Sequence, residues 1–279
     1  MEAVKILDIK SDGLNMALDD NSLYVRCGRV IHKYNLSDMK MAASNEVFKK
    51  DGKSRNLAVS DNYIALYDFC ELYVLNKDDL RVVYNIRLGE NQSSDITAVH
   101  CDAAKAFVSI RNGSMAVVDI ITQNVEKYKF SDKSAWDFAI ADKYLYVGTT
   151  GGELFRINKL DMRITNDIQL CKPNVHSVLP CDDVLYTMSR DKILRVLKTV
   201  DFETVHMVKK AASTSARLLG AHKDYLVMAD WSSILLWDRN TLQLCETFKF
   251  PTGYLISGAL LVNGILYGSD YQNVYKLNL

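Results

Sequence analysis

The stretch Lys223-Asp-Tyr-Leu-Val-Met-Ala-Asp-Trp-Ser-Ser-Ile-Leu-Leu-Trp-Asp-Arg-Asn-Thr-Leu-Gln-Leu-Cys-Glu-Thr-Phe248 decides the fold of this 279-residue chain. It contains three short apolar runs separated by two groups of turn-forming residues. We interpret it as three consecutive β-strands joined by tight turns. The same pattern returns along the whole sequence, so this stretch is one unit of a repeat.

An apolar triplet recurs at intervals of about forty residues. The seven triplets centre on Tyr24, Ala65, Phe107, Tyr146, Tyr186, Val227 and Tyr267. A tight-turn signal precedes each of them, for example Asp20-Asn21, Asp61-Asn62 and Asn263-Gly264. The combination of a turn signal and an apolar triplet occurs seven times at a nearly constant interval, which predicts seven structurally equivalent units.

Each unit shows further positions of a four-stranded sheet. An inner strand is predicted eight residues before the triplet centre, at Met16, Leu57, Val99, Phe138, Val178, Leu219 and Ala259. A third strand ends in an apolar residue and a polar one, and a fourth, outer strand follows in six units. The seventh unit lacks that outer strand, whereas the segment Ala3–Lys10 is a strand with nothing before it. The N-terminal strand is therefore expected to complete the last sheet, which protects the sheet edges.

Four-stranded units of this length are typical of propeller blades. The chain resembles the WD40 family over its whole length: Trp237-Asp238 matches the signature dipeptide, and six of seven units have Asp or Asn at its second position. The family's Gly-His pair is absent, so the resemblance does not carry over the Asp-His-Ser/Thr-Trp network. An open sandwich would not repeat seven times in phase, and a parallel β-helix would have shorter coils.

We therefore expect an all-β fold, a single seven-bladed β-propeller over residues 1–279. The predicted blades span residues 13–54, 55–94, 95–134, 135–173, 174–214, 215–254, and 255–279 plus 1–12.

Composition limits the kind of partner. Lys plus Arg and Asp plus Glu number 34 each, so we do not expect a protein that relies on bulk charge to bind nucleic acid or anionic membrane, and a local basic patch remains an open alternative. No run of apolar residues predicts a secretory signal or a membrane span. The six cysteines show no metal-binding or redox spacing, and we interpret them as reduced packing residues. We expect a cytoplasmic location, with the nucleus as an alternative.

No catalytic, metal-binding or cofactor-binding motif is found. Gly148-Thr-Thr-Gly-Gly152 lies in a turn between strands and not before a helix, so it cannot cradle a phosphate. The histidines are scattered over different units. We expect that the protein is not an enzyme and that it binds neither a metal nor a cofactor.

The remaining candidate is a binding face. In WD40-like propellers the inner strands begin, and the turns between second and third strands open, at the face called the top. This resemblance predicts partner-binding residues rich in arginine and aromatic side chains, the types enriched in binding hot spots. They are Arg55, Arg111, Trp136, His176, Arg190, Arg217, Trp231 and Tyr271. Trp237, within a third strand, is predicted to pack in the core.

The favoured function is a non-enzymatic protein-interaction scaffold, a subunit of a larger complex that binds other proteins chiefly through the top face. Its arginines suit acidic or phosphorylated peptide segments. One alternative is an enzyme with a small-molecule or metal site at the channel mouth. Another is association with RNA through the basic connectors Lys49–Arg55 and Lys209–Arg217, although we expect nucleic acid only within a larger complex.

Overall fold

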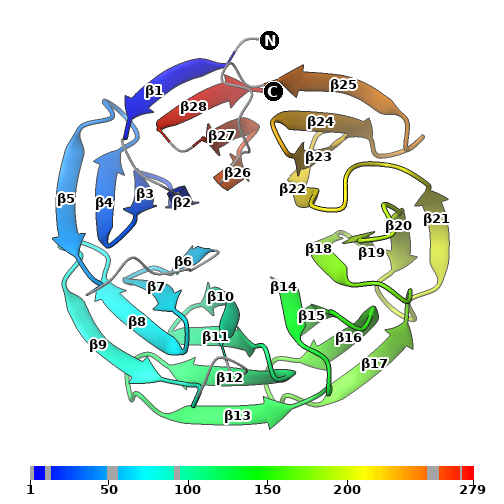
Figure 1. The fold of residues 1–279 in the computed structure, drawn as a ribbon, viewed down its shortest axis with the longest axis horizontal. Helices are drawn as coiled ribbons and strands as arrows, with labels where there is room; N and C mark the ends of the chain where they lie inside the picture. The colour runs from blue at the N-terminus through cyan, green and yellow to red at the C-terminus, as the bar shows by residue number, and fades with distance from the viewer. Residues whose placement is uncertain (1–2, 10–13, 49–55, 91–94, 250–257, 271) are drawn as a thin grey trace. The chain divides into compact units, whose positions relative to one another are not determined.

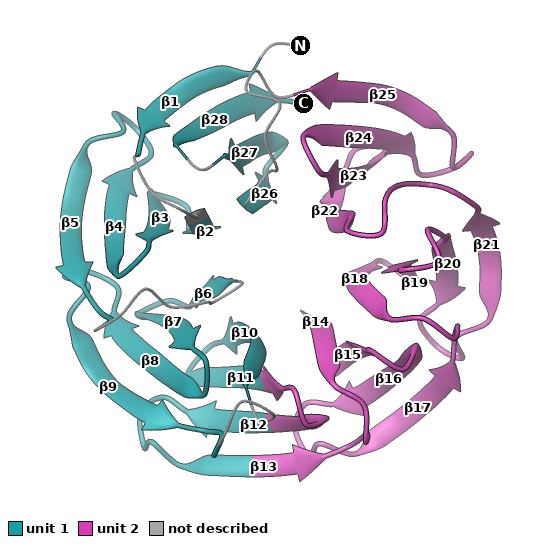
Figure 2. Cartoon of the chain, in the orientation of Figure 1, with its two compact units in different colours: residues 1–108, 116–126, 251–279 teal, residues 109–115, 127–250 magenta. Residues whose placement is uncertain are grey.

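The computed structural model describes residues 3–9, 14–48, 56–90, 95–249, 258–270 and 272–279. Its regular elements in these ranges are all β-strands, arranged as seven four-stranded antiparallel sheets (Figure 1). The chain falls into two compact units, which Figure 2 shows in different colours. Unit 1 comprises residues 1–108, 116–126 and 251–279, and unit 2 comprises residues 109–115 and 127–250.

Unit 1 holds three whole sheets and most of a fourth, whose remaining residues belong to unit 2. The sheet of blade 1 contains β2 (Leu14–Leu18), β3 (Ser22–Cys27), β4 (Val30–Asn35) and β5 (Met41–Glu46). Blade 2 contains β6 (Leu57–Val59), β7 (Tyr63–Asp68), β8 (Glu71–Asn76) and β9 (Val82–Arg87). Blade 3 contains β10 (Ile96–Asp102), β11 (Lys105–Ile110), β12 (Ser114–Asp119) and β13 (Val125–Lys129).

The last sheet confirms that strands from the two ends of the sequence pair. It joins β1 (Val4–Asp8) to β28 (Asn273–Asn278), followed by β27 (Ile265–Ser269) and β26 (Gly258–Val262). β1 runs antiparallel to β28, with Val4 opposite Lys276. The N-terminal strand thus supplies the outer strand that the seventh repeat lacks.

Unit 2 holds the sheets of blades 4, 5 and 6. Blade 4 contains β14 (Ala135–Ala141), β15 (Tyr144–Thr149), β16 (Glu153–Asn158) and β17 (Ile164–Gln169). Blade 5 contains β18 (Val175–Cys181), β19 (Val184–Ser189), β20 (Leu194–Lys198) and β21 (Thr204–Val208). Blade 6 contains β22 (Arg217–His222), β23 (Tyr225–Asp230), β24 (Ser233–Asp238) and β25 (Leu244–Lys249).

The apolar triplets are the second strands, and burial on both faces explains their continuous hydrophobicity. Leu226, Val227 and Met228 of β23 are all 0% exposed. Trp237 is 6% exposed and packs in a cluster with residues of blades 5 and 6, including Tyr186 and Leu218. The prediction that Trp237 belongs to the core is confirmed.

The turns before the triplets have the left-handed backbone that their sequences predicted. The φ angles are 47° at Asp142, 55° at Asp182 and 51° at Lys223. Gly152 is a stricter case, with φ of +83° and a position where a Cβ would lie 2.0 Å from the carbonyl oxygen of Cys171. Only glycine fits this close approach between a turn and the connector that follows the blade.

One predicted inner position is wrong. Leu219 was expected to face the core, but it lies in a register irregularity between Leu218 and Gly220, and Leu218 is the buried residue, at 8% exposure. The extra residue shifts the alternation of side chains by one position.

Candidate functional site

The candidate site is the connector face of unit 2. We use this name for the surface formed by the connectors 130–134, 170–174 and 209–216 and by the turns 150–152, 190–193 and 231–232. The connectors lead from an outer strand to the next inner strand, and the turns join second strands to third strands. This is the face predicted from the sequence as the top.

Hydrogen bonds between successive inner strands organise this face. A carboxylate oxygen of Asp137 in β14 accepts the N–H of Val178 in β18 at 3.2 Å. The hydroxyl of Ser177 in β18 accepts the N–H of Leu218 in β22 at 3.0 Å. Each acceptor occupies the position just before the buried inner residue of its strand. Short polar side chains at this position therefore bind one blade to the next.

Arg217 occupies the corresponding position of blade 6. It pairs with Ala229 as Ser177 pairs with Met188. A guanidinium carries only donors and cannot accept a backbone N–H. The Arg217 side chain is exposed, so the position that holds blades together in β14 and β18 presents a cation to solvent in β22.

Arg190 is also exposed, and it follows a buried ionic network. Arg195 in β20 donates to both carboxylate oxygens of Asp191, at 3.3 and 2.6 Å, and to the hydroxyl of Ser189 at 2.7 Å. Burial by itself would raise the pKa of Asp191, but the hydrogen bonds from Arg195, Ser189 and the Ile193 N–H outweigh it and lower that pKa. This network ties the turn 190–193 to β19 and β20.

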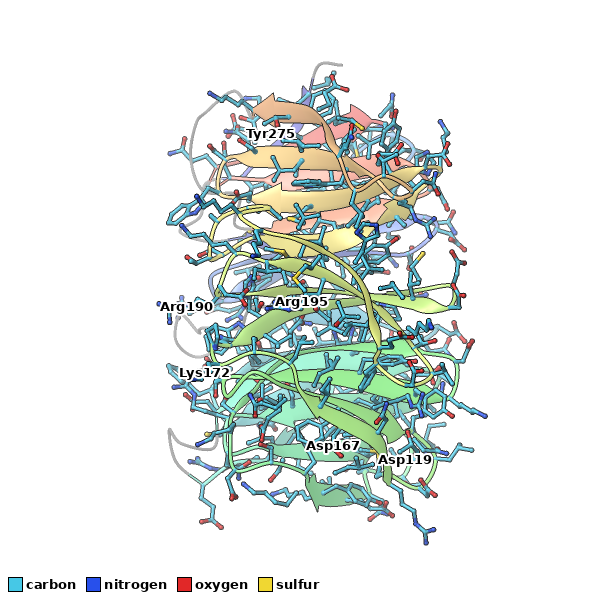
Figure 3. All side chains as sticks on the ribbon, turned by 90° about the vertical axis from the view of Figure 1, so that its right-hand side faces the viewer. Asp119, Asp167, Lys172, Arg190, Arg195 and Tyr275 are labelled. Carbon is cyan, nitrogen blue, oxygen red and sulfur yellow. The ribbon has the colours of Figure 1, made fainter. Side chains whose placement is uncertain are left out.

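Further exposed cations lie on the same face as that turn. Figure 3 places Lys172 and Arg190 at the same side of the molecule, with Arg195 within the sheet. The N–H of Arg190 donates to the carbonyl oxygen of Asn174 at 2.9 Å, which ties the turn to the connector that carries Lys172. The exposed basic residues of the face are Lys133, Lys172, Arg190, Lys192, Lys209, Lys210 and Arg217, together with Arg111 of the turn 111–113.

The acidic residues of the same surface are largely engaged within the protein. Asp191 is bound by Arg195, and Asp230 accepts the N–H of Ser213 at 3.0 Å. Asp132 is exposed and lies 3.5 Å from Lys129. The connector face of unit 2 therefore carries a positive excess although the whole chain is neutral.

Trp231 is the aromatic residue that this face presents to solvent. It is 55% exposed and has φ of 49° in the turn between β23 and β24. A bulky side chain in the left-handed region is strained, and this one gains little from burial. Neither backbone preference nor packing accounts for tryptophan at this position.

Two other predicted residues are less accessible. His176 is 8% exposed, and its Nε2 lies 2.7 Å from the carbonyl oxygen of Ala216. Burial lowers its pKa more than the carbonyls of Ala216 and Asn174 raise it. Trp136 is half-buried at a register irregularity in β14. We therefore assign His176 a structural contact between blades 5 and 6 rather than a place on the exposed surface.

The structure adds candidates and leaves others outside its described ranges. Arg55 and Tyr271 both lie outside the described residues. In unit 1, Phe69 occupies a turn position like that of Trp231, with φ of 48° and 42% exposure. Lys172 and Lys192 were not among the predicted site residues. Their position in a connector and a turn of the same face was the signal that could have identified them.

The described residues contain no group of three or more His, Cys, Asp or Glu side chains that could hold a metal ion. Within the same ranges, no helix is long and apolar enough to cross a membrane.

Comparisons with known proteins identify the fold. No family model and no curated protein matches the chain. The β-propeller domain of Cps50 (Swd1) from Myceliophteria thermophila is similar over 99% of this chain and 100% of that one, with a TM-score of 0.80 and 12% identity. The computationally designed protein Ika8 is similar over 99% and 98%, with a TM-score of 0.77 and 12% identity. The chain has the fold of a seven-bladed β-propeller.

Proposed function

We propose that this protein is a non-enzymatic interaction module that binds an acidic segment of a partner protein through the connector face of unit 2. Trp231 is the observation that carries the proposal. A tryptophan held in a left-handed turn and 55% exposed has the character of a binding hot spot, since aromatic rings supply large contact area at low entropic cost.

The charge of the face defines the chemistry of the partner. Lys172, Arg190 and Arg217 are exposed, and Asp191 is already neutralised by Arg195. Arginine forms bidentate hydrogen bonds with carboxylates and phosphates, so an acidic or phosphorylated segment is the partner that these residues suit. The rigid sheets beneath hold the cations in place before binding, which lowers the entropic cost of association. We place this function in the cytoplasm or nucleus, as part of a larger complex.

Affinity purification from the native cell tests the proposal. The full-length protein should recover stoichiometric protein partners, and Trp231→Ala and Arg217→Glu should each reduce the recovery at least about tenfold. Arg163→Glu is the matched control, because Arg163 is exposed in the turn between β16 and β17, outside the connector face. Recovery unchanged by Trp231→Ala and Arg217→Glu would contradict the proposed surface. Recovery of a stoichiometric metabolite in place of proteins would contradict the proposed class.

A further inference from the structure

The outer strand β21 differs from the other outer strands in having no charged residue. Its sequence is Thr204-Val-His-Met-Val208, whereas β1, β5, β9, β13, β17 and β25 each contain Lys, Arg, Asp or Glu. Proteins commonly place charges on edge strands to prevent pairing with another chain. β21 lacks this protection.

The free edge of β21 is open to solvent. Among the residues that the structure describes, β21 is the terminal strand of its sheet and pairs only with β20, as Figures 1 and 2 show at the edge of unit 2. Val205 is 46% exposed and Met207 is 51% exposed. The register irregularity at Val205 also occurs in β5, β9, β17 and β25, so it does not set β21 apart. An uncharged, apolar and exposed edge has the properties of a strand-pairing site.

The flanking charges identify the occupant. Asp201 and Glu203 precede the strand, and Lys209 and Lys210 follow it. Glu203 and Lys209 stand three residues before and three residues after His206. Glu203 thus flanks one end of β21 and Lys209 the other, so if two copies of β21 (Thr204–Val208) pair antiparallel about His206, the Glu203 end of each copy lies beside the Lys209 end of the other. The segment is thus complementary to itself in charge.

We infer that β21 is the site of self-association, at which a second copy of this chain pairs antiparallel and joins two four-stranded sheets into one. The interface is isologous, with two Glu203–Lys209 pairs related by a twofold axis. In the single chain Glu203 already contacts Lys198, and both side chains are about half exposed, so the carboxylate is accessible to a second lysine. A strand pair of this length forms a weak, concentration-dependent dimer.

Sedimentation velocity of the full-length protein from about 1 to about 100 μM tests the inference. The wild type should pass from monomer to dimer within this range. Val205→Lys should abolish the dimer by placing a charge on the pairing edge. Glu203→Lys and Lys209→Glu should each weaken dimerisation at least about tenfold by opposing like charges, and the double substitution should restore it to within about threefold. Glu246→Lys in β25 is the matched control and should leave the dimer unchanged.

The decisive measurement is the dimerisation of the double variant, in which the charges of Glu203 and Lys209 are exchanged. A monomer throughout the concentration range overturns the inference, as does a dimer that neither Val205→Lys nor the single charge substitutions weaken. Failure of the double variant to recover overturns the antiparallel arrangement. The folded state of each variant is verified by its thermal unfolding, which these exposed positions should alter little. The outcomes of Val205→Lys and Glu203→Lys are independent of the proposed function, because these two variants leave every residue of the connector face unchanged.

Discussion

The hydroxyl of Ser177 accepts the backbone N–H of Leu218 at 3.0 Å and thereby joins the inner strands of blades 5 and 6. Ser177 is 2% exposed, so the bond is shielded from water. In blade 6, the equivalent residue is the exposed Arg217. The same position along the inner strand therefore joins two blades in blade 5 and presents a cation to solvent in blade 6.

Ser177→Ala should destabilise the protein. The substitution leaves the buried N–H of Leu218 without its acceptor, and an unsatisfied buried donor costs about 2 kcal/mol. Urea unfolding followed by circular dichroism measures the change. Ser215→Ala, at an exposed position of the connector, should alter the free energy of unfolding by less than about 0.5 kcal/mol. Equal effects of the two substitutions would contradict the role of the inner-strand bond.

Gly152→Ala should destabilise the protein by at least about 2 kcal/mol. The new Cβ would meet the carbonyl oxygen of Cys171 at 2.0 Å, and the backbone at φ of +83° adds strain. Gly151→Ala is the control, because there the Cβ would meet the flexible side chain of Lys133, which can move. Thermal unfolding of both variants should show the larger decrease in melting temperature for Gly152→Ala.

His176 should make stability depend on pH in the weakly acidic range. Burial lowers the pKa of its imidazole in the folded protein, so below about pH 6.5, the ordinary value, the unfolded chain binds a proton more readily than the folded one. The contribution of neutral His176 is therefore present above that pH and is lost as the pH falls. His176→Gln should reduce the decrease in melting temperature between about pH 7 and about pH 5. An unchanged pH profile would contradict the assignment.

Asp191 should also make the stability of the protein depend on pH, in a more acidic range than His176. Burial alone would raise the pKa of Asp191 in the folded state, but the hydrogen bonds from Arg195 and Ser189 outweigh burial and lower that pKa. The stabilising effect of the Asp191 carboxylate is therefore present above about pH 4 and is lost below it. Asp191→Asn leaves the buried Arg195 guanidinium without its counterion and should cost about 3 kcal/mol at neutral pH. The difference between wild type and variant, measured by urea unfolding, should diminish as the pH falls through about 4 to about 3.

Trp231 should dominate the quenching of tryptophan fluorescence by iodide. Of the three tryptophans, Trp231 is 55% exposed, Trp237 is 6% exposed and Trp136 is half-buried. Trp231→Phe should remove most of the accessible component in a quenching titration, whereas Trp237→Phe should leave it. If Trp231→Phe does not reduce quenching, the ring is covered in solution, and its place on the binding surface is contradicted.

The repeat was predictable because burial constrains it. Triplets such as Leu226, Val227 and Met228 must be apolar on both faces of a covered sheet, so the sequence pattern shows the second strands directly. The pairing of β1 with β28 followed from the missing strand of the seventh repeat. The exposure of Trp231 followed from its place in a turn between two recognisable strands.

Other features depend on geometry that one sequence does not contain. The register irregularity in β22 moves burial from Leu219 to Leu218. Because both residues are leucine, the sequence does not show which of the two is buried. His176 was predicted at the surface, but the irregularity in β18 and the carbonyl of Ala216 hold its ring in the interior. Lys172 lies in a connector without periodicity, so its place on the same side of the molecule as Arg190 emerges only when the strands are assembled.

The pairing of β1 with β28 has a consequence for synthesis in the cell. The partner of β1 is the final strand of the sequence, so β1 leaves the ribosome long before it can pair. During that interval Val4, Ile6 and the unpaired backbone of β1 are available to chaperones and to other nascent chains. Because loop closure between distant segments is slow, completion of this last sheet is expected to be the late step of folding. A modification that blocks the edge of β1 would thus slow the completion of folding, because it prevents the pairing of β1 with β28.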